Sequence, residues 1–125
     1  MKHINLLILI TVSISCAGQH NEVLSPIDFK SKIVLPTVTL LDVRTIEEYK
    51  AGHLDKATNI DINHPKFEDQ CDKLDRAKPV LVYCLVGKRS HRAAEMLRSK
   101  GYKVLELDGG MKAWQAAGLP VVTNP

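Results

Sequence analysis

The sequence predicts an α/β domain with a central parallel β-sheet flanked by helices on both faces. Short apolar segments alternate along the chain with segments that carry helix signals, as in parallel-sheet folds. The apolar segments have no polar face, as expected of strands that are covered on both sides. With 125 residues, 45% of them hydrophobic, the chain has room for a single domain. We place it at residues 25–123, after a short linker at residues 18–24.

The first half of this domain begins with a helix. Ser25 is a typical N-cap residue and is followed by proline, which predicts a helix over residues 26–32. The β-branched and apolar segment 38–43 predicts a strand. Thr45 is the next N-cap residue, and it predicts a brief helix over residues 46–51 that ends before a glycine.

A second strand and a helix that carries a cysteine follow. Residues 57–62 form the strand candidate, and residues 65–74 predict the helix. Phe67, Cys71 and Leu74 fall on one face of that helix, where a free cysteine behaves as a small hydrophobic residue. We therefore expect Cys71 to pack in the core rather than to form a disulfide.

The last part of the domain alternates in the same way. Residues 80–84 predict the most deeply buried strand, and residues 89–100 an amphipathic helix that ends at Gly101. Residues 104–107 predict a further strand and residues 110–117 a closing helix. Together the four predicted strands and their helices support one sheet between two helical layers.

The segment that precedes the domain has the order of a secretory signal. A basic start is followed by the apolar run 4–14, which is too short to span a bilayer, and by small residues. Ser15 and Ala17 fit ordinary release after residue 17, whereas Cys16 after Ser15 fits a bacterial lipoprotein signal. We therefore expect residues 1–17 to be a signal peptide. The bacterial protein would be exported, either periplasmic or anchored to the membrane through a lipid on Cys16.

The composition excludes several kinds of site. The formal net charge is only +3 and the charged residues are interspersed, so the chain lacks the basic stripe that nucleic-acid binding requires. Aromatic residues make up 5% of the chain, too few for base-stacking platforms. No cysteine or histidine spacing is typical of zinc, and we expect neither a metal site nor an organic cofactor.

Cys84 is the candidate nucleophile. It ends a buried strand, and in parallel sheets ligands bind where the carboxyl ends of strands lead into helices. The turn at residues 85–88 contains Gly87 and precedes a helix, so its N–H groups can converge as an anion-binding nest. Lys88 and Arg89 add positive charge. Without these neighbours Cys84 would be interpreted as a core cysteine. With them, we expect its pKa to be lowered and the thiolate to be reactive.

Three segments resemble the motifs of single-domain rhodaneses. The first is LLDVRTIEEYKAGHLDKATNI at residues 40–60, the second is VYCLVGKRS at residues 82–90, and the third is LDGGMKAWQAAGLPV at residues 107–121. They occur in the family's order and spacing, and the similarity covers residues 25–122. The resemblance implies a rhodanese-like domain with sulfurtransferase activity.

The resemblance also implies a reaction and a set of site residues. Cys84 would take a sulfane sulfur from thiosulfate or another small anionic donor, become a persulfide, and pass the sulfur to a thiol or a cyanide-like acceptor. The residues implied to bind the donor are those of the loop: Leu85, Val86, Gly87, Lys88 and Arg89. Four residues separate Cys84 from Arg89, one fewer than in the related phosphatases, which favours sulfur transfer over phosphate hydrolysis.

Two apolar loop residues do not favour thiosulfate as the only sulfur donor. Leu85 and Val86 stand where polar residues often follow the cysteine, and Glu48 places an anion near the expected rim. A larger donor, or a partner protein that donates or accepts sulfur, is therefore an alternative to thiosulfate.

For the remaining motif residues we expect structural roles. Asp42 and Arg44 lie at a strand end and are predicted to support the site through an internal salt bridge rather than to do chemistry. His91 is predicted to be solvent-exposed. Three further residues are predicted to pack turns, loops or the core: His53, Asn59 and Trp114.

Two other functions use the same cysteine. The first is a persulfide carrier or binding module that turns over poorly without a partner. The second is a thiol redox protein in which Cys84 pairs reversibly with Cys71 or another thiol. The redox protein and a phosphatase are both less favoured than the carrier.

Overall fold

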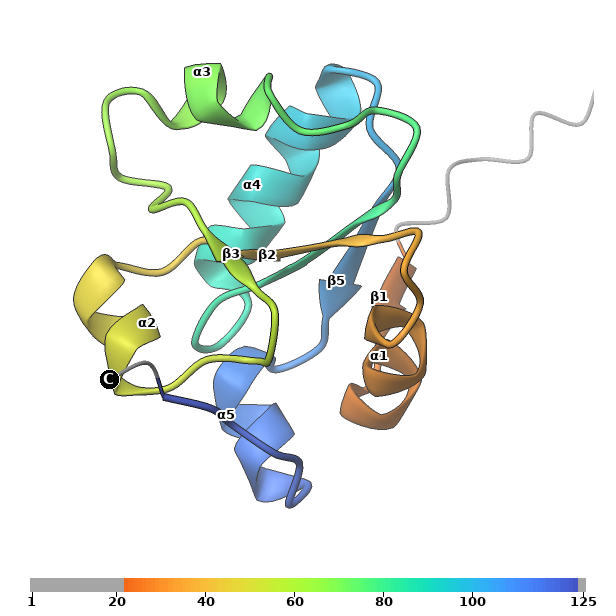
Figure 1. The fold of residues 1–125 in the computed structure, drawn as a ribbon, viewed down its shortest axis with the longest axis vertical. Helices are drawn as coiled ribbons and strands as arrows, with labels where there is room; N and C mark the ends of the chain where they lie inside the picture. Colours follow the sequence, from red (N-terminus) through yellow and green to blue (C-terminus); the bar gives the residue numbers. More distant parts are fainter. Residues whose placement is uncertain (1–21, 124–125) are drawn as a thin grey trace, which may run out of the picture.

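The computed structural model describes residues 22–123, and the predicted signal peptide, including Cys16, lies outside this range. The described chain alternates strands and helices (Figure 1). The strands are β1 (Glu22–Leu24), β2 (Thr39–Asp42), β3 (Thr58–Asn59), β4 (Val80–Tyr83) and β5 (Val104–Leu107). The helices are α1 (Pro26–Ile33), α2 (Ile46–Ala51), α3 (Phe67–Cys71), α4 (Lys88–Ser99) and α5 (Gly110–Ala116).

The strands form one parallel sheet in the order β1-β5-β4-β2-β3. The central pair aligns Leu41 of β2 with Val82 of β4, and β4 pairs in turn with β5. Because all strands run the same way, the loops that leave β2, β4 and β5 meet at one edge of the sheet. The predicted parallel α/β fold is therefore confirmed, and this edge is where a ligand site is expected.

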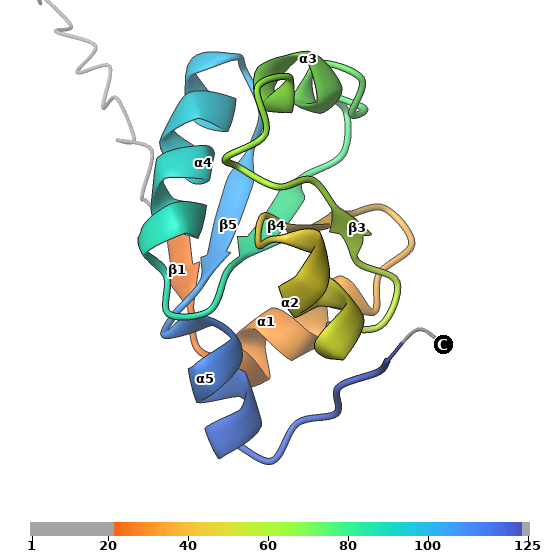
Figure 2. The ribbon, with the colours of Figure 1, turned by 90° about the vertical axis from the view of Figure 1, so that its left-hand side faces the viewer.

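Helices cover both faces of the sheet, as predicted. Successive strand residues point to opposite faces, so Leu81 packs with one layer and Val82 with the other. The Val82 face is covered by side chains of α3 and α4, including Phe67, Cys71 and Leu97. The Leu81 face is covered by α1 and α5, with Tyr49 of α2 at its margin. In both views α3 lies at the opposite end of the molecule from α5 (Figures 1 and 2).

Strand β1 was not predicted, because the sequence placed Glu22–Leu24 in the linker. Leu24 is only partly buried and Val23 is 48% exposed, so the segment has no buried-strand pattern that could identify it. It is a strand because its backbone pairs with β5, with Glu22 opposite Leu105. An edge strand of this kind is defined by its hydrogen-bonding neighbour rather than by its own composition.

The predicted helix starts agree with the caps that form. The Ser25 hydroxyl accepts a hydrogen bond from the N–H of Asp28 at 3.2 Å, and Thr45 forms a reciprocal capping box with Glu48. Helix α3 is shorter than predicted and covers five residues. None of the helices among residues 22–123 is long and apolar enough to cross a membrane.

Candidate active site

Cys84 lies directly after β4, at the edge of the sheet where the strand carboxyl ends meet. Its Sγ accepts a hydrogen bond from the N–H of Gly87 at 3.1 Å. Gly87 has φ +110°, a left-handed conformation that glycine adopts without strain and that folds the loop back over the sulfur. Helix α4 begins at the next residue. The predicted loop of N–H groups around the cysteine is therefore present.

The surroundings of Cys84 favour its thiolate. Burial raises the pKa of the thiol, since Cys84 is only 1% exposed. The hydroxyl of Ser90 and the N–H groups of Ser90, Gly87 and Val86 act in the opposite direction and outweigh burial. The pKa of Cys84 consequently lies below its usual value. The sequence predicted this direction, and an electrostatic interaction between Arg89 and Cys84 agrees with part of the predicted cause.

Ser90 is the site residue that sequence reasoning missed. It is fully buried in the first turn of α4, and its Oγ lies 3.2 Å from the carbonyl oxygen of Gly87. A hydroxyl has a single proton, which can turn from this carbonyl to the sulfur when Cys84 ionises. A serine in the first turn behind a candidate nucleophile is a local signal that could have identified it.

We expect Ser90→Ala to lower kcat/KM for sulfur transfer at neutral pH by about tenfold, the loss that accompanies removal of one hydrogen bond to a charged group. Without this donor the pKa of Cys84 rises, so the acidic limb of the kcat/KM profile moves to higher pH. Ser99→Ala is the matched control, because Ser99 is an exposed serine on the same helix whose hydroxyl donates to a backbone carbonyl. Profiles of wild type and both variants that superimpose would show that Ser90 does not stabilise the thiolate.

The start of α5 fixes the backbone of the loop. The N–H of Met111 donates to the carbonyl of Cys84 at 2.9 Å, and the N–H of Lys112 donates to that of Leu85 at 3.1 Å. Gly110 has φ +60°, and a Cβ there would lie 2.6 Å from the carbonyl oxygen of Cys84. Glycine is therefore required where α5 approaches the loop, which explains the second glycine of the pair in the third motif.

The loop side chains do not all face the site mouth. Leu85 is partly buried and packs with the α1 and α5 layer, whereas Val86 is 46% exposed. Of the two apolar loop residues noted in the sequence, only Val86 is therefore exposed beside the site. Lys88 is exposed at the first position of α4.

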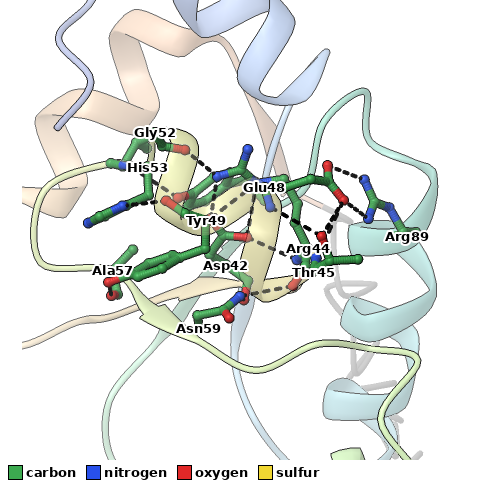
Figure 3. Close-up of polar contacts among 12 residues, drawn as sticks. Asp42, Arg44, Thr45, Glu48, Tyr49, Gly52, His53, Ala57, Asn59 and Arg89 are labelled. Carbon is green, nitrogen blue, oxygen red and sulfur yellow. Dashed lines mark hydrogen bonds and ion pairs between the residues drawn. The ribbon is translucent and has the colours of Figure 1, made fainter. Parts of the chain in front are cut away.

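Arg89 is paired with the carboxylate of Glu48. Its two terminal nitrogens form a two-point ion pair with the Glu48 carboxylate, at 2.7 and 2.9 Å (Figure 3). Glu48 also accepts hydrogen bonds from the N–H and the hydroxyl of Thr45, which hold it in the capping box of α2. The hydrogen bonds from Arg89 lower the pKa of Glu48 to about 2, and burial only partly opposes them. The sequence predicted both charges near the rim but not that they neutralise each other.

Asp42 and Arg44 form the predicted internal salt bridge. Arg44 Nη2 lies 2.7 Å from Asp42 Oδ2 and also donates to the carbonyl oxygen of Gly52 at 2.7 Å (Figure 3). Both side chains are buried, and the guanidinium lies 5.5 Å from the centre of the Tyr83 ring, one residue before Cys84. The pair therefore links the end of β2 to the end of β4 from within the core.

Asn59 and His53 have the packing roles that were predicted. The Asn59 amide donates to the backbone carbonyls of Asp42 and Arg44, which closes the turn after β2 (Figure 3). The His53 ring stacks on Tyr49 at 3.7 Å, and its Nδ1 lies 2.7 Å from the carbonyl oxygen of the same residue. Both residues stabilise the framework behind the site.

Trp114 and His91 also agree with expectation. Trp114 is buried and its indole N–H donates to the carbonyl of Pro120. His91 has a side chain that is 47% exposed, and it contacts the buried Glu106 at 2.9 Å and the exposed Glu95 at 3.1 Å. The hydrogen bond with Glu106 raises the pKa of His91. Its two ring nitrogens thus face carboxylates.

Cys71 is unsuited to pair with Cys84. Both cysteines are free, and Cys71 is fully buried among core side chains, as predicted. Burial raises its pKa to about 11. Cys71 ends α3, and its carbonyl accepts from Tyr102, which precedes β5. Cys84 follows the end of β4, where its carbonyl accepts from the start of α5, and Figure 2 shows α3 and α5 at opposite ends of the molecule.

A groove with a volume of about 680 Å³ borders the loop. It runs between residues 86–89 and the ends of β1 and β5, where residues 106–109 line it. It gives room beside the loop for a ligand larger than an inorganic anion. Within residues 22–123, no group of three histidine, cysteine, aspartate or glutamate side chains is placed to hold a metal ion.

Known proteins share this sequence and fold. The family model described as "Rhodanese-like domain" matches residues 25–117. The thiosulfate sulfurtransferase GlpE of Coxiella burnetii is 35% identical over 80 residues, which cover 63% of this chain and 73% of the relative. The crystal structure of a rhodanese-related protein from Thermoplasma volcanium has a TM-score of 0.75 and 30% identity, covering 82% of this chain and 99% of that one.

Other relatives are much longer. A probable molybdopterin-synthase adenylyltransferase of Porphyra purpurea is 40% identical over 75 residues, which are 60% of this chain but 20% of the relative. Two further relatives are matched over 37% and 34% of their length. The same domain thus occurs alone and within larger proteins.

Proposed function

The chain belongs to the rhodanese-like domain family, and we propose that it is a sulfurtransferase that carries sulfane sulfur on Cys84. The Cys84 thiolate attacks the outer sulfur of thiosulfate or another persulfide donor. The donor's S–S bond breaks, and sulfite or a thiolate leaves with the electron pair. A thiol or a cyanide-like acceptor then takes the outer sulfur, and Cys84 is released as the thiolate.

The hydrogen-bonded position of the Cys84 sulfur is the observation that carries this proposal. The N–H of Gly87 points at Sγ from 3.1 Å, and the pKa is lowered despite burial. The same N–H groups stabilise the sulfur when it attacks and again when it leaves as a thiolate, so one arrangement serves both half-reactions. This double use fits sulfur transfer, in which Cys84 is first nucleophile and then leaving group.

The phosphatase and redox alternatives fit the arrangement of residues around Cys84 less well than sulfur transfer does. A phosphatase needs the loop arginine to clamp the phosphate, and here Arg89 is held by Glu48. A redox pair with Cys71 would have to join thiols at opposite ends of the strands. A persulfide carrier uses the same chemistry as the enzyme and differs only in turnover. A partner protein that presents a thiol or persulfide is a further substrate class, for which the groove beside the loop gives room.

Intact-mass measurement before and after treatment with thiosulfate tests the proposal. We expect the protein to gain one sulfur atom, located at Cys84 by peptide mapping, and to lose it when cyanide is added. Multiple turnovers with thiosulfate and cyanide identify an enzyme, whereas a single loading without turnover identifies a carrier. A reduced Cys84 that stays unmodified with thiosulfate and with an organic persulfide would contradict both.

We also propose that the protein is exported and either released after Ala17 or anchored by a lipid on Cys16, because residues 1–17 have the order of a signal peptide. The intact mass of protein made in a bacterial host with its own leader separates the three outcomes. Mature protein that begins after residue 17, or a lipid-bearing Cys16, supports export, and a chain that retains residues 1–17 contradicts it.

A further inference from the structure

We propose that Glu48 determines which sulfur donors the site accepts, so that singly charged organic donors are favoured over the doubly charged thiosulfate. The donors in this class are thiosulfonates and persulfides, which carry an organic group and one negative charge at the reactive sulfur. The inference deepens the sulfurtransferase function proposed above and rests on it.

The loop cation is compensated by a fixed partner. Both terminal nitrogens of Arg89 bind the two oxygens of Glu48, so the end-on edge of the guanidinium, with which it would grip an anion at two points, is already occupied. A donor could gain the same two-point contact only by displacing Glu48. The Arg89 charge is therefore largely balanced before any donor arrives.

Glu48 is held in place from its own helix as well. Its Oε1 accepts from the N–H of Thr45 at 3.4 Å and from the hydroxyl at 3.2 Å, at the N-terminus of α2, where a carboxylate is stabilised. Glu48 is bound by a residue 41 positions away and by the cap of its own helix. Displacing it would break both sets of contacts, so the ion pair is expected to persist when a donor binds.

The mouth of the site is otherwise suited to an organic group. Val86 is 46% exposed at the loop, and the groove continues from it along residues 86–89. Among residues 22–123, Lys88 is the cation of the loop that no carboxylate pairs with, and Arg92 lines the groove one turn farther along α4. At the loop itself, where the reactive sulfur has to lie, the second charge of thiosulfate loses water without a second unpaired cation beside it, which weakens its binding.

The transfer step is balanced for these donors without any further reactant. With a thiosulfonate, the Cys84 thiolate bonds to the outer sulfur, the S–S bond breaks, and a sulfinate leaves with the electron pair. With a persulfide, the same bond forms and a thiolate leaves. In each case two negative charges enter and two remain, so neither a proton donor nor an oxidant is needed.

Glu48→Gln tests the inference, because glutamine at this position also forms capping boxes. The change removes the charge that balances Arg89 while keeping the size of the side chain. We expect kcat/KM for thiosulfate to rise about three- to fivefold at low ionic strength, and that for ethanethiosulfonate to change less than twofold. Glu47→Gln is the matched control, since Glu47 is exposed in the same turn and the net charge changes equally.

Arg89→Gln provides a second, independent test. It leaves the Glu48 anion unpaired at the mouth, so kcat/KM for thiosulfate should fall more than that for ethanethiosulfonate. In the double variant Glu48→Gln with Arg89→Gln, the gain for thiosulfate should disappear. This test remains informative if Glu48→Gln is poorly folded.

The inference would be overturned if the ratio of kcat/KM for thiosulfate to kcat/KM for ethanethiosulfonate were the same in wild type, Glu48→Gln and Glu47→Gln. It would also be overturned if Arg89→Gln lowered kcat/KM for both donors by the same factor. Failure of the proposed function looks different. In that case neither donor loads Cys84 in the wild-type protein, which the mass of the protein reports.

Discussion

Replacing Cys84 by serine is expected to lower sulfur transfer by a factor on the order of 10³ or more, to the level of the uncatalysed reaction. The loop stabilises a thiolate, and a serine hydroxyl does not ionise near neutral pH. An oxygen at this position also cannot hold the transferred sulfur as a persulfide. Steady-state assays with thiosulfate and cyanide, together with the protein mass after loading, measure both losses.

The fold should survive this change. Serine has nearly the shape of cysteine, and the N–H of Gly87 that donates to Sγ can donate to a hydroxyl instead. We expect the free energy of unfolding to change by about 1 kcal/mol. Full activity in Cys84→Ser would show that the mechanism is wrong.

Cys71→Ala is the control that separates sulfur transfer from redox chemistry. Cys71 packs in the core and has a pKa raised to about 11, so its removal should reduce stability but leave kcat/KM and sulfur loading intact. A loss of activity as large as that of Cys84→Ser, in a variant that remains folded, would instead favour the redox pair.

The features that could be predicted from the sequence are those that a short segment of the chain determines by itself. Cys84 and Gly87 lie three residues apart, and a buried strand, a glycine and a helix start predict a turn around the cysteine. The caps of α1 and α2 are local in the same way. The turn and the caps could be predicted because the groups that form their hydrogen bonds belong to residues that are neighbours in the chain.

What could not be predicted depends on partners that are distant in the sequence. Arg89 was predicted to add positive charge near Cys84, and the two groups do interact electrostatically. Its carboxylate partner Glu48 was not predicted, because it is 41 positions away and only the fold brings α2 beside the loop. Strand β1 depends in the same way on β5. A pattern of single residues gives their charge and hydrophobicity, but it does not specify which charges become paired.

The buried pair of Asp42 and Arg44 should have the largest effect on stability. We expect Asp42→Asn to lower the free energy of unfolding by about 3–5 kcal/mol, because the Arg44 guanidinium, 4% exposed, is left buried without its counter-charge. Urea denaturation measures this loss. Asp72→Asn is the control, since Asp72 pairs with Arg76 and Lys100 at the surface, where such pairs contribute about 1 kcal/mol or less.

A second variant identifies the cause of that loss. If the cost arises from the uncompensated charge, adding Arg44→Met to Asp42→Asn should restore part of the stability, because the buried cation is then removed. A double variant that is less stable than Asp42→Asn alone would show that Arg44 stabilises the core mainly through its contacts with Gly52 and Tyr83.

Because the pair acts from behind β4, kcat in the folded fraction of Asp42→Asn should stay within about twofold of wild type, in contrast to Cys84→Ser. A folded Asp42→Asn protein that loses transfer would place Asp42 in the chemistry rather than in the support of the loop.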